Sequence, residues 1–213
     1  MVRVVKKPEE RKSEIIATAC DLFLSKGYEK TTMKDVMRHL GIAKGTIYHY
    51  FNSKEELLEA VINSVAESEM LRLKMVVENL KGNALERLEQ LILNGSNHGA
   101  DDGHEEILDN LHKNSNAGMH IRLLAKVVTM QAPLYAEQFQ LGCEEGVFQT
   151  DHPLECAEFL LSGIQFLTDM GIYPWTQEQL ERRWKAFPKI IENQLNAPDG
   201  SFSFLLKIVP ENK

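Results

Sequence analysis

Residues 32–51 read Thr-Met-Lys-Asp-Val-Met-Arg-His-Leu-Gly-Ile-Ala-Lys-Gly-Thr-Ile-Tyr-His-Tyr-Phe. Thr32, with Asp35 three residues later, is typical of a capped helix start, and apolar residues at 36, 37 and 40 give that helix one apolar face. Gly41 follows where a helix end needs left-handed backbone, and a second short helix is predicted from about Lys44 to Tyr50. Two short helices joined by a tight turn indicate a helix-turn-helix, in which the second helix enters the DNA major groove.

The second helix has two faces of different chemistry. We expect Ile47 and Phe51 to face the core. The outward positions carry hydrogen-bonding groups or allow close approach of the backbone, as contacts to phosphates and base edges require. These are Lys44, Gly45, Thr46, Tyr48 and His49. Two short helices joined by glycine also occur in helical proteins that bind no DNA, so the flanking sequence has to decide between the two interpretations.

The flanks favour DNA binding. Residues 15–23 (Ile-Ile-Ala-Thr-Ala-Cys-Asp-Leu-Phe) and 26–28 (Lys-Gly-Tyr) precede the pair, and 45–55 read Gly-Thr-Ile-Tyr-His-Tyr-Phe-Asn-Ser-Lys-Glu. From about residue 10 to residue 60 the chain closely resembles the DNA-binding domain of the TetR (tetracycline repressor) family of bacterial regulators. Ala43 departs from the family, which usually has a capping side chain at this position. The missing side-chain cap costs the second helix about 1 kcal/mol.

The resemblance and the pattern together predict a three-helix DNA-binding domain. Its first helix runs from about Pro8 to Lys26, with Ile15, Ile16, Ala19, Leu22 and Phe23 as the buried stripe. The expected DNA-contacting residues are Thr32, Lys44, Gly45, Thr46, Tyr48, His49 and Lys54. Lys54 is included because it follows Ser53 at the start of the next helix, whose free amides attract a phosphate, and because the family's matching lysine approaches the DNA backbone.

Length, composition and charge agree with such a protein. A chain of 213 residues is long enough for two modest domains. It shows no transmembrane run and no signal peptide, and its three cysteines are scattered, so we expect a cytoplasmic protein without disulfides. Residues 1–60 hold 11 lysines and arginines against 9 acidic residues, whereas the remainder hold 13 against 22. DNA is therefore expected to meet only the N-terminal part.

The rest of the chain predicts helices and no strands, so the fold class is all-α. A Ser53-to-Glu56 capping box opens a helix of about 25 residues, followed by helices at about 84–93, 105–112, 119–146, 153–170 and 177–195. Residues 94–103 have no periodicity and are predicted to form a loop. Pro133 should start a new helix or kink a continuous one, and Pro188 should interrupt the last helix. The apolar tail at 202–209 should pack on the body. We divide the chain into a DNA-binding domain, 1–53, and a helical ligand-binding and dimerisation domain, 54–213.

The segment 153–170 is apolar around much of its circumference, which indicates burial on two sides. In TetR-like proteins the last two long helices form a four-helix dimer interface, so the resemblance implies that 153–170 and 177–195 form a homodimer here. A two-fold dimer would present two recognition helices to the half-sites of a pseudo-palindrome.

The resemblance also implies a small-molecule cavity among the middle helices. His120, Gln165 and Phe166 are the ligand-binding candidates, although aromatic residues at helical spacing are more often plain core. His104, His112 and His120 recur every eight residues, which is not the spacing that brings two imidazoles of one helix to one metal, so no metal site and no cofactor are predicted.

No catalytic motif is present: there is no phosphate-binding glycine loop, no G-x-S-x-G and no H-E-x-x-H, so we do not expect an enzyme. The sequence therefore predicts a ligand-responsive transcriptional regulator, most simply a repressor, that binds operator DNA as a dimer and is released by a small molecule. The alternative is a protein-interaction module that DNA binding only localises, with no small-molecule inducer.

Overall fold

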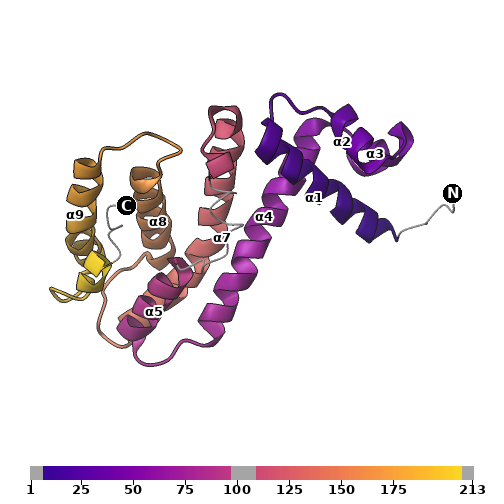
Figure 1. Ribbon diagram of the computed structural model, residues 1–213. Coiled ribbons are helices and arrows are strands. Elements are labelled where there is room, and N and C mark those ends of the chain that lie inside the picture. The colour runs from indigo at the N-terminus through magenta and orange to yellow at the C-terminus, as the bar shows by residue number, and fades with distance from the viewer. Residues whose placement is uncertain (1–6, 97–108, 208–213) are drawn as a thin grey trace. The chain divides into compact units, whose positions relative to one another are not determined.

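Helices are the only regular elements in residues 7–96 and 109–207, which a computed structural model of the chain describes (Figure 1). The all-α prediction is confirmed. None of the described helices is long and apolar enough to span a membrane. The elements are α1 (Pro8–Lys26), α2 (Met33–Leu40), α3 (Lys44–Tyr50), α4 (Lys54–Glu78), α5 (Ala84–Ser96), η1 (Asn114–Asn116), α7 (Ala117–Glu144), α8 (Pro153–Thr168), α9 (Gln177–Leu195) and η2 (Ser203–Lys207).

The chain forms two compact units, each of which combines two segments that are separate in the sequence. The first contains residues 1–67 and 102–123, and the second contains 68–101 and 124–213. Helices α4 and α7 each begin in the first unit and end in the second. The first unit therefore includes the start of α4 and the segment before α7 together with the N-terminal helices. The division into functional domains at residue 53 stays a prediction.

The first unit is built on α1, whose apolar side is buried. Ile15, Ala19 and Phe23 are fully buried as predicted, whereas Ile16 and Leu22 are only half-buried. Four further residues of α2, α3 and α4 join this core: Val36, Ile47, Leu57 and Val61. Burial of an aliphatic or aromatic side chain of this size stabilises a fold by about 1.5–3 kcal/mol, so these few side chains are enough to hold three short helices together.

The second unit has one continuous apolar core. It includes Leu73, Leu88, Leu91, Phe139, Phe148, Leu160, Phe187, Ile191, Leu195 and Phe202. The C-terminal tail packs here as predicted, with Phe202, Phe204 and Leu205 buried. The buried carboxylate of Glu192 fixes it, because one of its oxygens accepts hydrogen bonds from Gly200 N at 2.8 Å and Phe202 N at 3.3 Å. The last predicted residues of the tail, 208 and 209, lie outside the described part of the chain.

Some sequence predictions about helix boundaries need correction. Helix α9 is continuous through Pro188, so the predicted interruption there was wrong. Helix α7 is continuous through Pro133, which leaves only the second of the two predicted alternatives, a continuous helix. Tertiary packing on both sides of each proline outweighs the one backbone hydrogen bond that it removes. Helix α5 extends to Ser96, so residues 94–96 of the predicted loop are helical, and its remaining part, 97–103, lies outside the described residues. Of the weakly helical segment at 105–112, residues 109–111 are helical.

Candidate DNA interface

Helix α2 begins with a reciprocal capping box. The Thr32 hydroxyl accepts from Asp35 N at 3.2 Å and donates to Asp35 Oδ2 at 2.7 Å, while Thr32 N donates to the same carboxylate at 3.0 Å. Lys26 and Arg38 form ion pairs with that carboxylate at 2.8 and 2.7 Å. The hydrogen bond from Lys26, followed by those from Thr32, holds the pKa of Asp35 far below its usual range. One carboxylate thus joins the end of α1 to the start of α2.

The turn between α2 and α3 has the geometry that the sequence predicts. Gly41 is left-handed, with φ of 61° and ψ of 32°, and Ile42 N donates back to Met37 O at 3.1 Å. Helix α3 starts at Lys44 without a side-chain cap, since Ala43 provides none. The turn sets the angle at which α3 leaves α2, which is the geometry that a recognition helix requires.

Helix α3 has one buried and one exposed face. Ile47 and the following Phe51 are buried at 0 and 2% exposure, as predicted. Four of the five outward candidates are exposed, namely Lys44, Gly45, Tyr48 and His49, and Thr46 is half-buried. Lys44 Nζ lies 5.6 Å from the centre of the Tyr48 ring, and the His49 ring contacts Tyr50 edge-on. This face offers an ammonium group, an imidazole and a phenol together, the donors that bind phosphates and base edges.

The other two candidates have intramolecular partners. The Thr32 hydroxyl caps α2, as described above. Lys54 Nζ donates to Tyr28 O at 3.0 Å and Glu29 O at 3.4 Å, and lies 4.1 Å from the centre of the Tyr28 ring. An ammonium group has three protons, so one N–H remains for a phosphate. Sequence reasoning missed these contacts because they join residues about 26 positions apart, and no local pattern marks them.

Residues 109–123 pack behind the helix-turn-helix, inside the first unit. Asn116 is 1% exposed, accepts from Tyr28 N at 2.9 Å and donates to Leu24 O at 3.4 Å and Asn110 O at 2.8 Å. Gly27 lies so close that a β-carbon there would be 2.7 Å from Ser115 Cβ. The turn at η1 therefore packs against the end of α1, and the side-chain amide of Asn116 uses its oxygen and its NH₂ group in hydrogen bonds to the backbone.

A second contact lies one turn further along α7. Arg122 Nη1 pairs with Glu55 at 2.7 Å and with Glu59 at 2.8 Å, both in the first turns of α4. The Tyr28 hydroxyl donates to Glu55 at 3.2 Å. The hydrogen bond from Arg122 lowers the pKa of Glu55, whereas burial, followed by the hydrogen bond to Glu55, raises the pKa of Tyr28 to about 12. At neutral pH the phenol is therefore a donor and the carboxylate is ionised.

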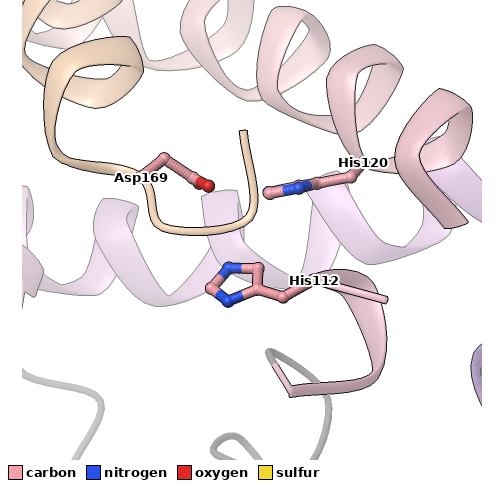
Figure 2. A group of neighbouring side chains, drawn as sticks. All are labelled: His112, His120 and Asp169. Atoms are coloured by element: carbon pink, nitrogen blue, oxygen red, sulfur yellow. The ribbon is translucent and has the colours of Figure 1, made fainter. Parts of the chain in front are cut away.

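His112 and His120 lie together, which the sequence argument did not expect. Their ring centroids are 5.1 Å apart and the rings are tilted by 37° (Figure 2). The eight-residue spacing would separate two histidines along one helix, but here a turn and η1 come between them and the two rings lie close together. Asp169, also drawn in Figure 2, belongs to the second unit, where its Oδ1 accepts from Gly171 N and Ile172 N. His104 lies outside the described residues.

The three ligand-binding candidates fall in different units. His120, in the first unit, is 2% exposed, whereas Gln165 is half-buried and Phe166 is 54% exposed in the second. Two features of the second unit were not anticipated. An open groove of about 390 Å³ runs along α4 and α5, lined by Arg72, Met75, Val76, Asn79, Leu80, Gln90 and Asn94. Gln138 in α7 is 2% exposed, and its Oε1 has no hydrogen-bond partner among the described residues.

Two family models match the chain. The one described as bacterial regulatory proteins, tetR family, matches residues 15–61, and the one described as tetracyclin repressor-like, C-terminal domain, matches residues 101–190. The first match covers the helix-turn-helix from the middle of α1 into α4.

Relatives and solved structures agree with these matches. The HTH-type transcriptional repressor KstR2 of Mycobacterium tuberculosis is 26% identical over 71% of this chain and 76% of its own length. KstR2 of Rhodococcus jostii is 26% identical over 88% of this chain and 92% of its own. A putative TetR-family regulator from Mesorhizobium loti superposes with a TM-score of 0.60 at 22% identity, covering 89% of this chain and 98% of that one, which shows a shared fold.

Proposed function

The chain belongs to the TetR family of bacterial transcriptional regulators, and from this premise we propose that it is a cytoplasmic repressor that binds a pseudo-palindromic operator as a homodimer. In this proposal residues 1–53, together with Lys54 at the start of α4, contact DNA, and residues 54–213 dimerise and bind the small molecule that releases the operator. The family is one of DNA-binding regulators and not of enzymes, and several relatives are named repressors.

The exposed face of α3 carries the DNA part of the proposal. Lys44, Tyr48 and His49 project from a helix whose Ile47 is fully buried, so their positions are fixed by the core. We assign Lys44 to base edges or phosphates and Tyr48 to phosphates, with Gly45, Thr46 and His49 beside them. Lys54 would contribute its remaining N–H, and Thr32 would act by holding the start of α2 in place.

Helices α8 and α9 support the dimer. They lie side by side in the second unit (Figure 1), and α8 exposes Leu154, Phe159 and Phe166 at 40, 66 and 54%. Positions 159 and 166 are one heptad apart, with Ser162 exposed between them, so a single apolar stripe faces away from the unit's own core. Exposed phenylalanines in such a row are typical of an interface.

Support for an effector site in the second unit comes from Gln138. A buried amide oxygen without a partner costs about 1–3 kcal/mol, and a bound molecule or ordered water that donates to it would remove that cost. We propose a small molecule with a hydrogen-bond donor, accommodated where α7 borders the core. His120, in the first unit, and Gln165 and Phe166, in the second, stay ligand-binding candidates, with no shared site assigned to them.

The ligand would act by shifting a population. If it favours the conformation whose two recognition helices do not match the half-site spacing, operator affinity falls by the ratio of its affinities for the two conformations. A coupling free energy of about 1–3 kcal/mol corresponds to a 5- to 150-fold loss of affinity.

The alternative, a DNA-localised protein-interaction module, also has an observation in its favour. The apolar stripe on α8 would serve a different protein as well as a second copy of this chain. The two proposals differ in whether purified protein dimerises alone and whether its melting temperature responds to small molecules.

Selection from a random double-stranded DNA pool at near-physiological salt tests the main proposal. We expect enrichment of an inverted repeat, which requires sequence-specific binding by a two-fold dimer. Folded, dimeric protein that enriches no motif would contradict it, and enrichment of a single half-site by a monomer would favour the alternative.

Variants of α3 then test the assignments. We expect Tyr48→Phe to weaken binding to operator and random DNA alike without changing the salt slope, because the phenol carries no charge. Lys44→Gln, which removes a cation, should reduce the salt slope and change the enriched motif. Lys74→Gln, an exposed lysine of α4, is the matched control and should behave as wild type. A Lys44→Gln protein with an unchanged motif and slope would show that Lys44 does not contact DNA.

A further inference from the structure

Two histidines of the first unit, His112 and His120, lie close together. His112 has no role in the repressor proposal, and His120 enters it only as a ligand-binding candidate. His112 lies in the turn after residues 109–111, and His120 lies in the first turn of α7. His120 is 2% exposed and His112 is half-buried, so the two rings meet at the edge of the first unit's core (Figure 2). A buried imidazole is the side chain most often found as a ligand of transition metals.

The geometry of the pair suits a shared ion. A ring nitrogen of each histidine lies within 4.8 Å of the other. Nitrogens that share one tetrahedral zinc ion lie roughly 3.4 Å apart, because each zinc–nitrogen bond is about 2.0–2.1 Å long. A small rotation of either ring would close the difference. The half-buried position of His112 leaves a path by which an ion can enter.

We propose that His112 and His120 bind a divalent late transition-metal ion, such as Zn²⁺, Ni²⁺ or Co²⁺. Imidazole nitrogens suit these ions, whereas Mg²⁺ and Ca²⁺ prefer oxygen ligands. The two histidines supply two coordination positions, and the others are open to water, as in metal sites that exchange ligands.

The position of the pair gives the ion a regulatory consequence, which rests on the proposed DNA-binding function. The residues between the two histidines include Ser115 and Asn116, which fasten to Gly27 and Tyr28 at the end of α1. Arg122, two residues beyond His120, pairs with Glu55 and Glu59 at the start of α4. An ion held by both histidines would therefore fix the segment 112–120 in one conformation, and with it the support of the helix-turn-helix.

Metal binding can be measured without DNA. We would titrate untagged, chelator-treated full-length protein with Zn²⁺ by calorimetry and with Co²⁺ by visible absorption. The expected result is one ion per chain, with a cobalt spectrum that shows nitrogen ligands. His112→Gln should weaken binding at least about 10-fold, since losing even an outer-shell partner costs a metal site that much.

Two controls keep this test decisive. His152→Gln changes an exposed histidine at the α8 N-cap whose side chain makes no capping bond, so it should bind metal as wild type does. His120→Gln is the second ligand variant, used if circular dichroism shows it to be folded. Equal metal affinity in wild type and in folded His112→Gln, or no saturable binding by wild type, would overturn the proposal.

The regulatory step has its own readout. With the selected operator, saturating Zn²⁺ should change the affinity of wild type at least about 5-fold and leave His112→Gln unchanged. Arg122→Gln should keep its metal affinity but respond less, because its link to α4 is broken. Metal binding with no change in operator affinity would confirm the site and overturn its regulatory role. A protein that binds Zn²⁺ but no operator would instead contradict the repressor proposal.

Discussion

Asp35 illustrates how much of the DNA-binding domain depends on single side chains. Its carboxylate accepts hydrogen bonds from Thr32 and from Lys26 and pairs with Arg38, so it links α1 to α2. The sequence predicts the capping half of this arrangement from the spacing of Thr32 and Asp35. It does not predict Lys26, because a contact across nine residues and a helix end leaves no periodic pattern.

The ionised form of Asp35 should make the domain sensitive to acid. Its folded pKa lies below the unfolded pKa, so its contribution to stability is present at pH values above about 4 and is lost as pH falls toward the folded pKa. We expect Asp35→Asn to destabilise the protein at pH 7 and to approach wild type below pH 4, measured by urea unfolding. Asp21→Asn, an exposed aspartate of α1, is the control. A difference between wild type and Asp35→Asn that does not depend on pH would refute this.

Thr32→Ala, which removes the cap, should lower the free energy of unfolding by about 1 kcal/mol.

Gly27 is constrained twice. Its φ is +94°, which side chains rarely adopt, and a β-carbon would collide with Ser115. We expect Gly27→Ala to lower the free energy of unfolding by about 1–3 kcal/mol for the backbone alone, and by more for the collision. Gly146→Ala is the matched control, because Gly146 also has positive φ, at +75°, but has no neighbour within 4 Å. Equal losses in urea unfolding would show that the contact with Ser115 adds nothing.

At the scale of elements, apolar periodicity predicts which helices form better than it predicts where a helix is interrupted. The bounds of α1, α4 and α9 agree closely with the apolar repeats, and α4 begins after the predicted capping box at Ser53. The interruption predicted at Pro188 was wrong, because local rules do not include the tertiary packing that keeps a helix intact. The exposed face of α3 was predictable from its two-faced pattern. The contact of η1 with α1 was not, because it depends on which distant segments fold onto one unit.

Pro133 lies on the exposed side of α7 and has no apparent packing role, yet it removes a backbone hydrogen bond. We expect Pro133→Ala to raise the free energy of unfolding by about 1–3 kcal/mol, since an internal proline costs about 3 kcal/mol relative to alanine in an unstrained helix. Thermal unfolding measures this, with exposed Glu137→Ala as the control for a general helix-propensity effect. A melting temperature that stays the same or falls would mean that Pro133 shapes α7 for a purpose, such as a bend at the effector site.

At the scale of the whole molecule, recognition of a pseudo-palindrome requires two copies of α3 at a fixed separation, and one protomer supplies only one. Among the described residues, we propose the exposed stripe on α8 as the surface that pairs two protomers. Its phenylalanines are costly to leave in water, and a partner copy would bury them by the same symmetry that the operator requires.

We therefore expect Phe159→Glu and Phe166→Glu each to weaken dimerisation about 30-fold or more, because a charge would replace a central aromatic contact. Leu71→Glu is the matched control: Leu71 is 64% exposed and apolar, but it lies on α4, outside the stripe. Sedimentation equilibrium gives the dimer constants, and operator binding at protein concentrations below the mutant's dimer constant should fall in parallel. If both phenylalanine variants stay dimeric, the interface lies elsewhere, and the stripe on α8 becomes the leading candidate for a different protein partner.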